Sequence, residues 1–513
     1  MKKKFLSLFL SAALVGSMLV GCGSSSQGTS TESSTTTESN AAEGTASGAD
    51  EGEPYTVAIQ LVNISTDLTD VEKVEEAINE ITVPAINCKV DIQNLFIGDL
   101  PTTTSMNIVS GEKMDLVCVG LTQNLSDIAD DGILMPIDSY LIYAPTLVNL
   151  VSDYLIAGQI DGVQYALPVN PYLASGRGFV YNKDMAEEYG IEIKDGATYA
   201  DFEEAFEILK EHGIYGTSMG NAATLGLQFW YNLEIFGTNG DYGMISDPAN
   251  NTTIESVYAS DEFKEYADMM KKWTDAGYMP SDSLTDSTTV QEYFNSQNIF
   301  GTSANYNMSE FATWGTGKSF NIDIAEIQDP VISTSSVVER MWGIASNSEN
   351  PQKAMEFLNY IYENADVANL LQYGIEGENY TIVEGTTRVT TAEGATTGTA
   401  GYTSMFTQFG NPVDTYTAAP NTDSYPDDVK AYNEGVPNSA ILGYSFDVTE
   451  FSAEAGAVSN VIAEYMPRLV TGQVDDVDSY LAEFLAALDK AGYNDIIAGN
   501  QAQLDSFLSK NQE

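Results

Sequence analysis

Short apolar runs alternate with amphipathic helical stretches from residue 54 onward. Tyr55–Val62 is a near-continuous run of apolar and β-favouring residues, which predicts a buried strand. Lys89–Phe96 and Met114–Val119 predict two more strands. Between the first two lies one apolar helix face, formed by Val71, Val74, Ile78 and Ile81. Repeated strand–helix units predict a mainly parallel sheet with helices on both faces.

The loops that follow these strands are candidate positions for a ligand site. Ligands of open parallel sheets bind beyond the carboxyl ends of the strands. We therefore expect residues 63–66 and 120–124 at the edge of a site. The helix after the first loop is expected to begin in a capping box, Thr69-Asp70-Val71-Glu72.

A second α/β region is predicted to start near Pro168. Thr198-Tyr199-Ala200-Asp201 has the pattern of a capping box, and an apolar helix face follows it. His212, the only histidine, falls at the end of this helix, where a cation interacts favourably with the helix dipole. Trp273 lies on the apolar stripe of a helix that starts after Ser260, so we expect it in the core.

The last third of the chain combines helices with one irregular region. Asn350-Pro351 predicts a helix start, and the stripes 458–465 and 480–488 predict two helices near the C-terminus. Residues 384–426 lack a clear period and are rich in Thr, Gly and Pro. Their Tyr and Phe residues still provide apolar surface to bury, so this region is predicted to be irregular but ordered.

Composition argues against several functions. The 513 residues include 21 Lys and Arg and 74 Asp and Glu, which gives a formal net charge of −53. Binding to a phosphate backbone requires a basic surface, so no nucleic-acid partner is expected. A single histidine argues against a His-rich zinc site and a Ser-His-Asp triad, and we expect no metal and no cofactor. A hydrolase that uses two carboxylates is not excluded.

The N-terminus indicates export and membrane attachment. Lys2–Lys4 precede the apolar run Phe5–Val20, as in a secretory signal peptide. That run is shorter than the roughly 20 residues of a membrane-spanning helix. Leu19-Val20-Gly21-Cys22 resembles the lipobox of bacterial lipoproteins, in which the cysteine becomes the first mature residue and receives a diacylglycerol. Two acyl chains anchor a protein stably, so we expect removal of 1–21 and lipid attachment at Cys22.

Residues 22–53 are predicted to form a disordered tether. Beyond Cys22 they are almost entirely Ser, Thr, Gly, Ala, Glu and Asp, and they lack the apolar surface that could offset the entropy of ordering. The remaining cysteines, Cys88 and Cys118, lie in apolar runs where a small thiol packs well. We favour free thiols over a disulfide, which an exported protein could also form.

Aromatic residues gather with amides at points predicted to lie between elements. A sugar ring has an apolar C–H face and a rim of hydroxyls, so its site needs flat aromatic platforms and polar side chains. Any one of these rings taken alone is more often core than platform. The groups lie around 170–172, 229–232, 305–307 and 341–342, and the candidate ligand contacts in them are Asn170, Tyr172, Trp230, Tyr231, Tyr306 and Trp342.

Arg177 is a further candidate, because positive residues are scarce and it stands in the small-residue segment Ser175-Gly176-Arg177-Gly178. Its forked donor could hold sugar hydroxyls or a uronic carboxylate. Equally, it could pair with one of the many carboxylates of this chain.

Several segments resemble, in order, motifs of the extracellular solute-binding lipoproteins (family 1 type) of carbohydrate ABC transporters. They are Leu134–Leu141, Asp161–Pro168, Tyr181–Asp184, Trp273–Tyr278 and Gly343–Ser348. Two later segments, Tyr373–Tyr380 and Leu442–Asp447, resemble a Gram-positive branch with a distinctive C-terminal block. The likeness covers nearly everything after the tether, and it adds Glu376 to the candidate ligand contacts.

The resemblance implies a two-lobed α/β fold of the periplasmic-binding-protein-like type II class, with hinge strands between the lobes. By analogy, the chain would cross between lobes near 165–170, return near 331–340 and cross again after Tyr373. The expected lobes are 54–167 with 328–375 (N-terminal) and 168–327 with 376–513 (C-terminal).

The hypothesis that follows is a membrane-anchored extracellular receptor without enzymatic activity. It would capture a sugar or oligosaccharide between its lobes, as a monomer on the outer face of the cell membrane, and deliver it to the permease subunits of an ABC transporter. A receptor for another solute, such as a peptide, is the first alternative because it would share the fold. An extracellular glycoside hydrolase is the weaker one.

Overall fold

The computed structural model describes residues 52–64, 68–220, 225–392 and 400–511. The expected signal peptide 1–21, the lipidation site Cys22 and nearly all of the tether 22–53 lie outside these residues. Among the described helices, none is both long and apolar enough to cross a membrane.

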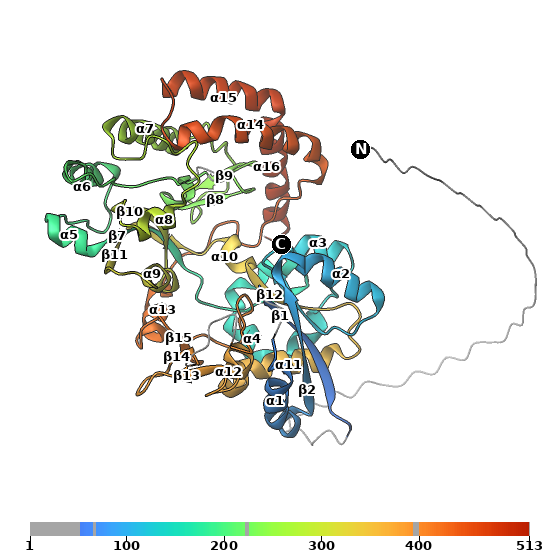
Figure 1. Ribbon diagram of the computed structural model, residues 1–513. Helices are drawn as coiled ribbons and strands as arrows, with labels where there is room; N and C mark the ends of the chain where they lie inside the picture. The colour runs from blue at the N-terminus through green and yellow to red at the C-terminus, as the bar shows by residue number, and fades with distance from the viewer. Residues whose placement is uncertain (1–51, 65–67, 221–224, 393–399, 512–513) are drawn as a thin grey trace, which may run out of the picture. The chain divides into compact units, whose positions relative to one another are not determined.

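A five-stranded sheet forms the centre of the first lobe (Figure 1). The strand order is β2-β1-β3-β12-β6; β1 is parallel to β2 and β3, whereas β12 is antiparallel to β3 and β6. The three strands predicted in residues 55–119 are confirmed to within two residues. The sheet consists of β1 (Tyr55–Asn63), β2 (Cys88–Phe96), β3 (Leu116–Gly120), β6 (Ala166–Pro168) and β12 (Arg340–Ile344).

Helices bury their apolar faces against this sheet in one large hydrophobic core and a smaller one that includes Ile128 of α3. The helices are α1 (Val71–Ile86), α2 (Leu100–Ser110), α3 (Leu125–Asp130), α4 (Pro145–Leu150), α10 (Thr334–Val338), α11 (Pro351–Glu363) and α12 (Ala365–Tyr373). Short 3₁₀ helices span 97–99, 138–143 and 152–158, and a small hairpin joins β4 (Gln159–Ile160) to β5 (Val163–Gln164).

The first predicted capping box is wrong, and the start of α1 shows why. Asp70 occupies the N-cap position, but its carboxylate makes no bond to the helix backbone. It accepts a hydrogen bond from Asn379 Nδ2 at 2.9 Å and pairs with Lys73 at 3.0 Å. The Asp70 carboxylate therefore binds a residue distant in sequence instead of capping α1. The predicted apolar face is correct, since Val74 and Ile78 are buried.

The second lobe has its own hydrophobic core and two smaller antiparallel sheets, β10-β7-β11 and β8-β9. Its strands are β7 (Ser175–Asn182), β8 (Leu233–Ile235), β9 (Met244–Ser246), β10 (Gly301–Tyr306) and β11 (Ile322–Val331). Its helices are α5 (Lys183–Tyr189), α6 (Tyr199–Glu211), α7 (Asp261–Ala276), α8 (Val290–Asn295), α9 (Met308–Gly315), α14 (Ser452–Val470), α15 (Val477–Ala491) and α16 (Tyr493–Lys510). Short 3₁₀ helices span 227–229 and 449–451.

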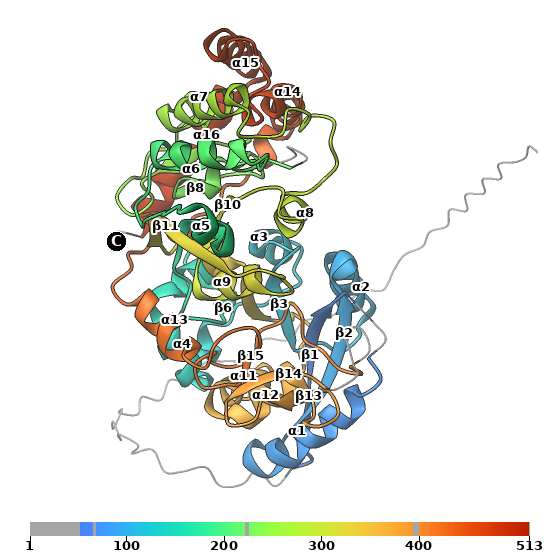
Figure 2. The ribbon, with the colours of Figure 1, turned by 60° about the vertical axis from the view of Figure 1, so that its left-hand side comes forward.

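Local predictions for this lobe are confirmed. The Asp201 carboxylate accepts a hydrogen bond from the backbone N–H of Thr198 at 2.7 Å, which closes the predicted capping box of α6. His212 follows the last residue of that helix, and its ring lies 4.5 Å from the ring of Tyr189. Trp273 on α7 is fully buried. Figures 1 and 2 show α14 and α15 beside α7, where they complete this core.

Most of the region after α12 packs on the first lobe, while its helix α13 also contacts the second lobe. It contains β13 (Tyr380–Ile382), β14 (Arg388–Thr391), β15 (Thr417–Ala418) and α13 (Tyr425–Asn433). Tyr402 and Phe409 are buried in the first core. This packing differs from the expectation that all of 376–513 belongs to the C-terminal lobe, because the region's aromatic residues find their apolar surface on α12 and β12.

Three stretches of chain run between the two cores, at 169–174, 332–333 and 434–443. The last two run side by side: Ser439 N–H donates to Ile332 C=O at 2.8 Å, and Ile332 N–H donates to Pro437 C=O at 3.0 Å. Glu234 on β8, which is 5% exposed, bonds to both of these connections. Its carboxylate accepts from Thr334 N–H at 2.9 Å and from the hydroxyl of Ser439.

Candidate ligand-binding site

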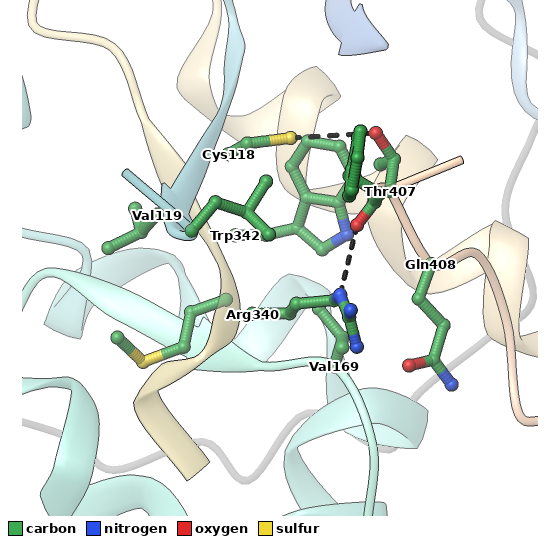
Figure 3. Close-up of a pocket in the computed structure, with 10 residues that line it drawn as sticks. Cys118, Val119, Val169, Arg340, Trp342, Thr407 and Gln408 are labelled. Atoms are coloured by element: carbon green, nitrogen blue, oxygen red, sulfur yellow. Dashed lines mark hydrogen bonds between the residues drawn. The ribbon is translucent and has the colours of Figure 1, made fainter. Parts of the chain in front are cut away.

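A cavity of about 240 Å³ lies in the first lobe, between the end of α12 and the segment 405–425. Aromatic rings contribute much of its wall, and polar side chains complete it. The aromatic residues are Tyr373, Phe406, Phe409, Tyr416 and Tyr425, and the polar ones include Arg340, Gln372, Gln408, Thr415, Thr417 and Asn421. A second cavity, of about 10 Å³, shares Arg340 and residues 406–408 with the first (Figure 3).

These cavities lie beyond the carboxyl ends of the parallel strands. Arg340, the first residue of β12, pairs with Gly120, the last residue of β3. The segment that carries the wall is bonded to the end of β1: Phe406 N–H donates to Val62 C=O at 3.2 Å, and Met405 N–H donates to Asn63 Oδ1 at 3.0 Å. Leu121 lines the smaller cavity, as expected for residues 120–124. Part of the other expected loop, 65–67, lies outside the described residues.

Trp342 closes the smaller cavity. Its indole lies between Cys118 and Arg340 (Figure 3), and its ring centre is 5.7 Å from that of Phe409. The side chain is only 2% exposed, and its Nε1 has no hydrogen-bond partner among the described residues. Arg340 donates from Nε to Phe406 C=O at 3.0 Å and pairs with Glu339 at 3.0 Å, which fixes the guanidinium at the mouth.

In the second lobe, Arg177, Trp230 and Tyr231 lie together. Trp230 is 3% exposed, with its ring centre 5.9 Å from that of Phe179 and 5.1 Å from that of Tyr199. Arg177 donates from Nε to Tyr231 C=O at 3.2 Å, so it ties β7 to this segment. The hydroxyl of Tyr231 donates to Glu265 at 2.8 Å, and burial raises its pKa.

Arg177 has neutral partners only. From Nη1 it donates to Gly176 C=O at 2.9 Å and to Ser175 Oγ at 3.5 Å, and among the described residues no carboxylate pairs with it. Burial lowers its pKa to about 10, so it stays charged at neutral pH. The expected alternative, an ion pair with an Asp or Glu, is therefore not formed. Its fork remains able to donate to a further acceptor.

Tyr306 lies at the end of β10, against helix α13. Its ring is perpendicular to that of Tyr432, with centres 5.4 Å apart, and Tyr432 Oη donates to Tyr306 C=O at 3.0 Å. The same hydroxyl accepts from Gly176 N–H at 3.2 Å. Helix α13 starts at Tyr425 in the large cavity, seven residues earlier, which is about 10 Å along a helix. It therefore links the cavity to the strands that carry Arg177 and Tyr306.

The other candidates do not join this arrangement. Asn170 and Tyr172 form a local turn, in which Tyr172 N–H donates to Asn170 Oδ1 at 2.8 Å. Burial and the nearby Asp414 raise the pKa of Tyr172. Glu376 is exposed in a turn after α12 and lines neither cavity.

Polar atoms without partners gather at these two places. Within the described residues, eleven buried side-chain nitrogen or oxygen atoms have no hydrogen-bond partner. Three of them, on Trp342, Thr417 and Asn421, line the two cavities, and four more, on Tyr199, Gln228, Trp230 and Asn232, surround the Arg177 group. A buried polar group without a partner is costly unless a ligand or water satisfies it.

Sequence reasoning missed Arg340, Thr417 and Asn421. Residues 384–426 have no helix or strand period that would place their side chains on a face. The available signal was the high Tyr and Phe content of that region next to amides and threonines.

Metal and redox chemistry gain no support from the side chains. In the described ranges, no group of three or more His, Cys, Asp or Glu residues could hold a metal ion. Cys118 is a buried free thiol, as predicted, and Cys88 is buried as well. Burial raises the pKa of Cys118 to about 12, so it stays protonated.

Comparisons with known proteins agree on one kind of molecule. A carbohydrate ABC transporter substrate-binding protein of Streptococcus pneumoniae serotype 4 is 26% identical over 472 residues, which are 90% of this chain and 92% of that protein. The crystal structure of an N-glycan transport solute binding protein from Streptococcus pneumoniae has a TM-score of 0.75 and 24% identity, and the match covers 90% of this chain and 100% of that one. Its complex with Man5GlcNAc gives a TM-score of 0.60 over 90% and 99% of the two chains, at 24% identity.

A more distant structure has the same fold. It is described as an HMO-binding, ABC-transporter-associated solute binding protein from Bifidobacterium longum infantis. It is 14% identical, with a TM-score of 0.57, over 88% of this chain and 99% of that one. These likenesses confirm the two-lobed α/β fold of solute-binding proteins.

Two family models match the chain. The model described as a domain of unknown function (DUF3502) matches residues 440–509, which include α14, α15 and nearly all of α16. The model described as bacterial extracellular solute-binding protein matches residues 75–368, more than half of the chain. With the sheet order, the two cores and the three connections, this match shows that the chain belongs to the bacterial extracellular solute-binding protein family.

Proposed function

We propose that this protein captures a sugar or oligosaccharide outside the cell and delivers it to the permease of an ABC transporter. The observation that carries the proposal is the cavity at the carboxyl edge of the first sheet. Its aromatic rings suit the apolar face of a pyranose, and the polar side chains of its wall suit the hydroxyl rim. The names of the relatives, a carbohydrate substrate-binding protein and an N-glycan transport protein, support the same ligand class.

The second lobe supplies the opposing wall in this proposal. Arg177, Tyr231 and Tyr306 would approach the sugar when the lobes close around it, with Trp230 as the packed support behind them. Closure is a population shift, limited by the difference in ligand affinity between the closed and open forms. Asn170, Tyr172 and Trp342, which lie at or near the connections, stay candidate contacts, and Glu376 stays a more remote one.

The chain would act as a lipid-anchored monomer and would not cleave its ligand. The lipobox-like Leu19-Val20-Gly21-Cys22 supports attachment of a diacylglycerol at Cys22, on the outer face of the cell membrane. Expressing the protein with Cys22→Ser is expected to release it into the medium, whereas the parent stays with the membrane fraction.

Isothermal titration against a panel of oligosaccharides tests the ligand. We expect a Kd in the micromolar range or below for at least one member, quenching of tryptophan fluorescence on binding, and recovery of the intact glycan after incubation. Absence of heat with every saccharide, but heat with a peptide pool, would replace the sugar by a peptide. Recovery of shortened glycans would instead indicate a hydrolase.

A further inference from the structure

The C-terminal block 440–509, whose family model has no assigned function, lies in two different surroundings. Its helices α14 and α15 complete the second core. Its first residues and its last helix, α16, instead lie beside the connection at 434–443. Both of these parts contact the first lobe, as the next residues show.

Adjacent residues at the start of the block are buried in different lobes. Ile441 is fully buried in a cluster that includes Leu504 of α16. Leu442, the next residue, is 8% exposed and packs in the first core. At Gly443 a Cβ atom would lie 2.9 Å from the carbonyl oxygen of Ile156, so the bare backbone rests on the first lobe. This stretch of chain is therefore held from both sides.

Helix α16 is fastened to the same stretch by side-chain bonds. Asn500, which is fully buried on α16, accepts at Oδ1 from the hydroxyl of Tyr444 at 2.7 Å and donates from Nδ2 to Tyr242 C=O at 2.8 Å. Gln503, one turn later, accepts from Asp447 N–H at 3.0 Å and donates to Asp447 C=O at 2.9 Å. These bonds join α16 and the start of the block into one unit.

The end of α16 reaches the first lobe. Lys510, its last residue, pairs with Asp161 in the turn between β4 and β5, with Nζ 2.6 Å from Oδ1. Both side chains are exposed, and an exposed ion pair adds little stability. The contact matters for its position, because it joins a helix of the second lobe to a hairpin of the first.

This contact lies at the opposite end of the first sheet from the cavities. Arg340, the first residue of β12, lines both cavities. Ile344, the last residue of the same strand, accepts a backbone bond from the segment 135–137, and Gln164 of β5 accepts from that segment as well, at 2.8 Å. The hairpin that carries Asp161 is thus at the far end. A rotation that brings the second lobe toward the cavities moves the end of α16 away from it.

We propose that the C-terminal block is a clamp that holds the lobes apart in the ligand-free protein and thereby sets the affinity for the ligand. Neither cavity in the described ranges is lined by a residue of the second core, so capture between the lobes requires a rotation. The block lines neither cavity. The apparent affinity scales with the fraction of protein in the binding-competent form, so a clamp on the open form lowers it. The inference rests on the proposed function and adds what limits closure.

Charge reversal at the end of α16 tests the clamp in the full chain. In Lys510→Glu a carboxylate faces Asp161, which makes this contact repulsive and favours closure. The Kd for a bound oligosaccharide, measured by isothermal titration, is expected to fall about two- to fivefold, the range that an exposed ion pair supplies. The double variant Lys510→Glu with Asp161→Lys restores an ion pair and is expected to restore the parent Kd. A merely structural role of Lys510 gives no gain in affinity.

A second measurement needs no ligand. Spin labels at Glu349→Cys, beyond the far end of β12, and at Ser506→Cys on α16 occupy exposed positions on the two sides of the contact. In the Cys22→Ser chain, Lys510→Glu is expected to lengthen the distance between the labels. The matched control is Lys272→Glu, which breaks an ion pair of the same 2.6 Å length within the second lobe. It is expected to change neither the distance nor the Kd.

The outcomes separate this inference from the function on which it rests. An unchanged or higher Kd in Lys510→Glu, with an unchanged label distance, would overturn the clamp and leave the receptor function standing. If the parent binds no saccharide, the proposed function fails and the label distance alone decides: a longer distance supports the clamp, and an unchanged one overturns it. Thermal unfolding of each variant without ligand shows whether a changed affinity comes from a changed fold.

Discussion

The two candidate walls contain similar residues in different surroundings. In the first lobe, Tyr416, Tyr425 and Asn421 border open volume. In the second lobe, Trp230 is enclosed by other rings and lies in the core, while Arg177 donates to two backbone carbonyls. Neither of the two described cavities includes a residue of the second group. Aromatic-plus-amide composition alone therefore does not distinguish an open binding wall from a packed support.

The tryptophans give the sharpest test of this difference. Trp230→Ala and Trp342→Ala are each expected to lower the free energy of unfolding by about 3 to 5 kcal/mol, because each empties a buried site. Trp342→Phe should also abolish most of the ligand-dependent quenching of fluorescence, whereas Trp230→Phe should keep it, since only Trp342 lines a cavity. Urea unfolding and a fluorescence titration measure the two effects. Equal loss of quenching in both Phe variants would contradict the contrast between the walls.

Glu234 tests whether the second lobe controls the connections. Glu234→Ala leaves Thr334 N–H and the Ser439 hydroxyl without their acceptor, so unfolding is expected to become easier by about 1 to 3 kcal/mol. Ser439→Ala removes one of these donors and leaves the other paired, so it is expected to lower the free energy of unfolding by less. A variant as stable as the parent would show that the carboxylate is dispensable for the connections.

The pKa of Glu234 also predicts how the stability of the protein changes with pH. Burial raises the folded-state pKa of Glu234 above its unfolded value. Its contribution to stability is therefore greatest below the unfolded pKa and is lost as pH rises through the folded pKa. Relative to Glu234→Gln, which does not titrate, the parent should gain stability as the pH falls from 7 toward 4. Urea unfolding of the parent and of Glu234→Gln across this pH range measures the difference in their free energies of unfolding. A parent that becomes less stable than Glu234→Gln on acidification would contradict the expected sign.

Tyr432 tests the link between the walls. Tyr432→Phe deprives Gly176 N–H of its acceptor and Tyr306 C=O of a donor, at an expected cost of about 1 to 3 kcal/mol. Because α13 joins the cavity to β7 and β10, ligand affinity should fall as well, although no cavity residue has changed. Tyr360→Phe, at a partly buried position on α11, is a control for loss of a tyrosine hydroxyl in the first lobe alone. Lower stability with unchanged affinity would limit Tyr432 to a structural role.

Matched helix caps provide the smallest effect. Asn350 caps α11 in the first lobe and Ser260 caps α7 in the second, each by accepting a backbone N–H about 3 Å away. Replacing either residue by Ala should lower the free energy of unfolding by about 1 kcal/mol. Calorimetry would show whether each variant moves one unfolding transition or the whole curve. A shift of a single transition by each cap would mean that the lobes unfold separately.

Elements with strong local signals could be predicted from sequence. Tyr55–Val62 predicted β1 because nearly every residue in it favours a buried strand, and Thr198 with Asp201 predicted the start of α6 because a capping box involves only four residues. Asp70 shows the limit of such reasoning. Its carboxylate could serve the helix backbone or Asn379, and residue 379 comes close only when the lobe has folded.

The candidate site was less predictable than the fold. Arg177 stood out because cations are rare, but its choice between a carboxylate and backbone carbonyls depended on which segment packs beside β7. Asn421 and Thr417 gave no signal, because an irregular segment has no period from which a shared face can be inferred. The packing of Tyr402 and Phe409 on the first core gave no signal for the same reason.

Sequence alone determined what depends on neighbouring residues: the first strands, the starts of α6, α7 and α11, the strong acidity and the succession of motifs typical of a solute receptor. Tertiary structure alone decided which lobe residues 376–442 join, where the open volume lies and which polar atoms lack partners. The reason is physical: a strand or a cap is stabilised by residues a few positions apart, whereas a cavity is the space left between segments that pack from opposite ends of the chain.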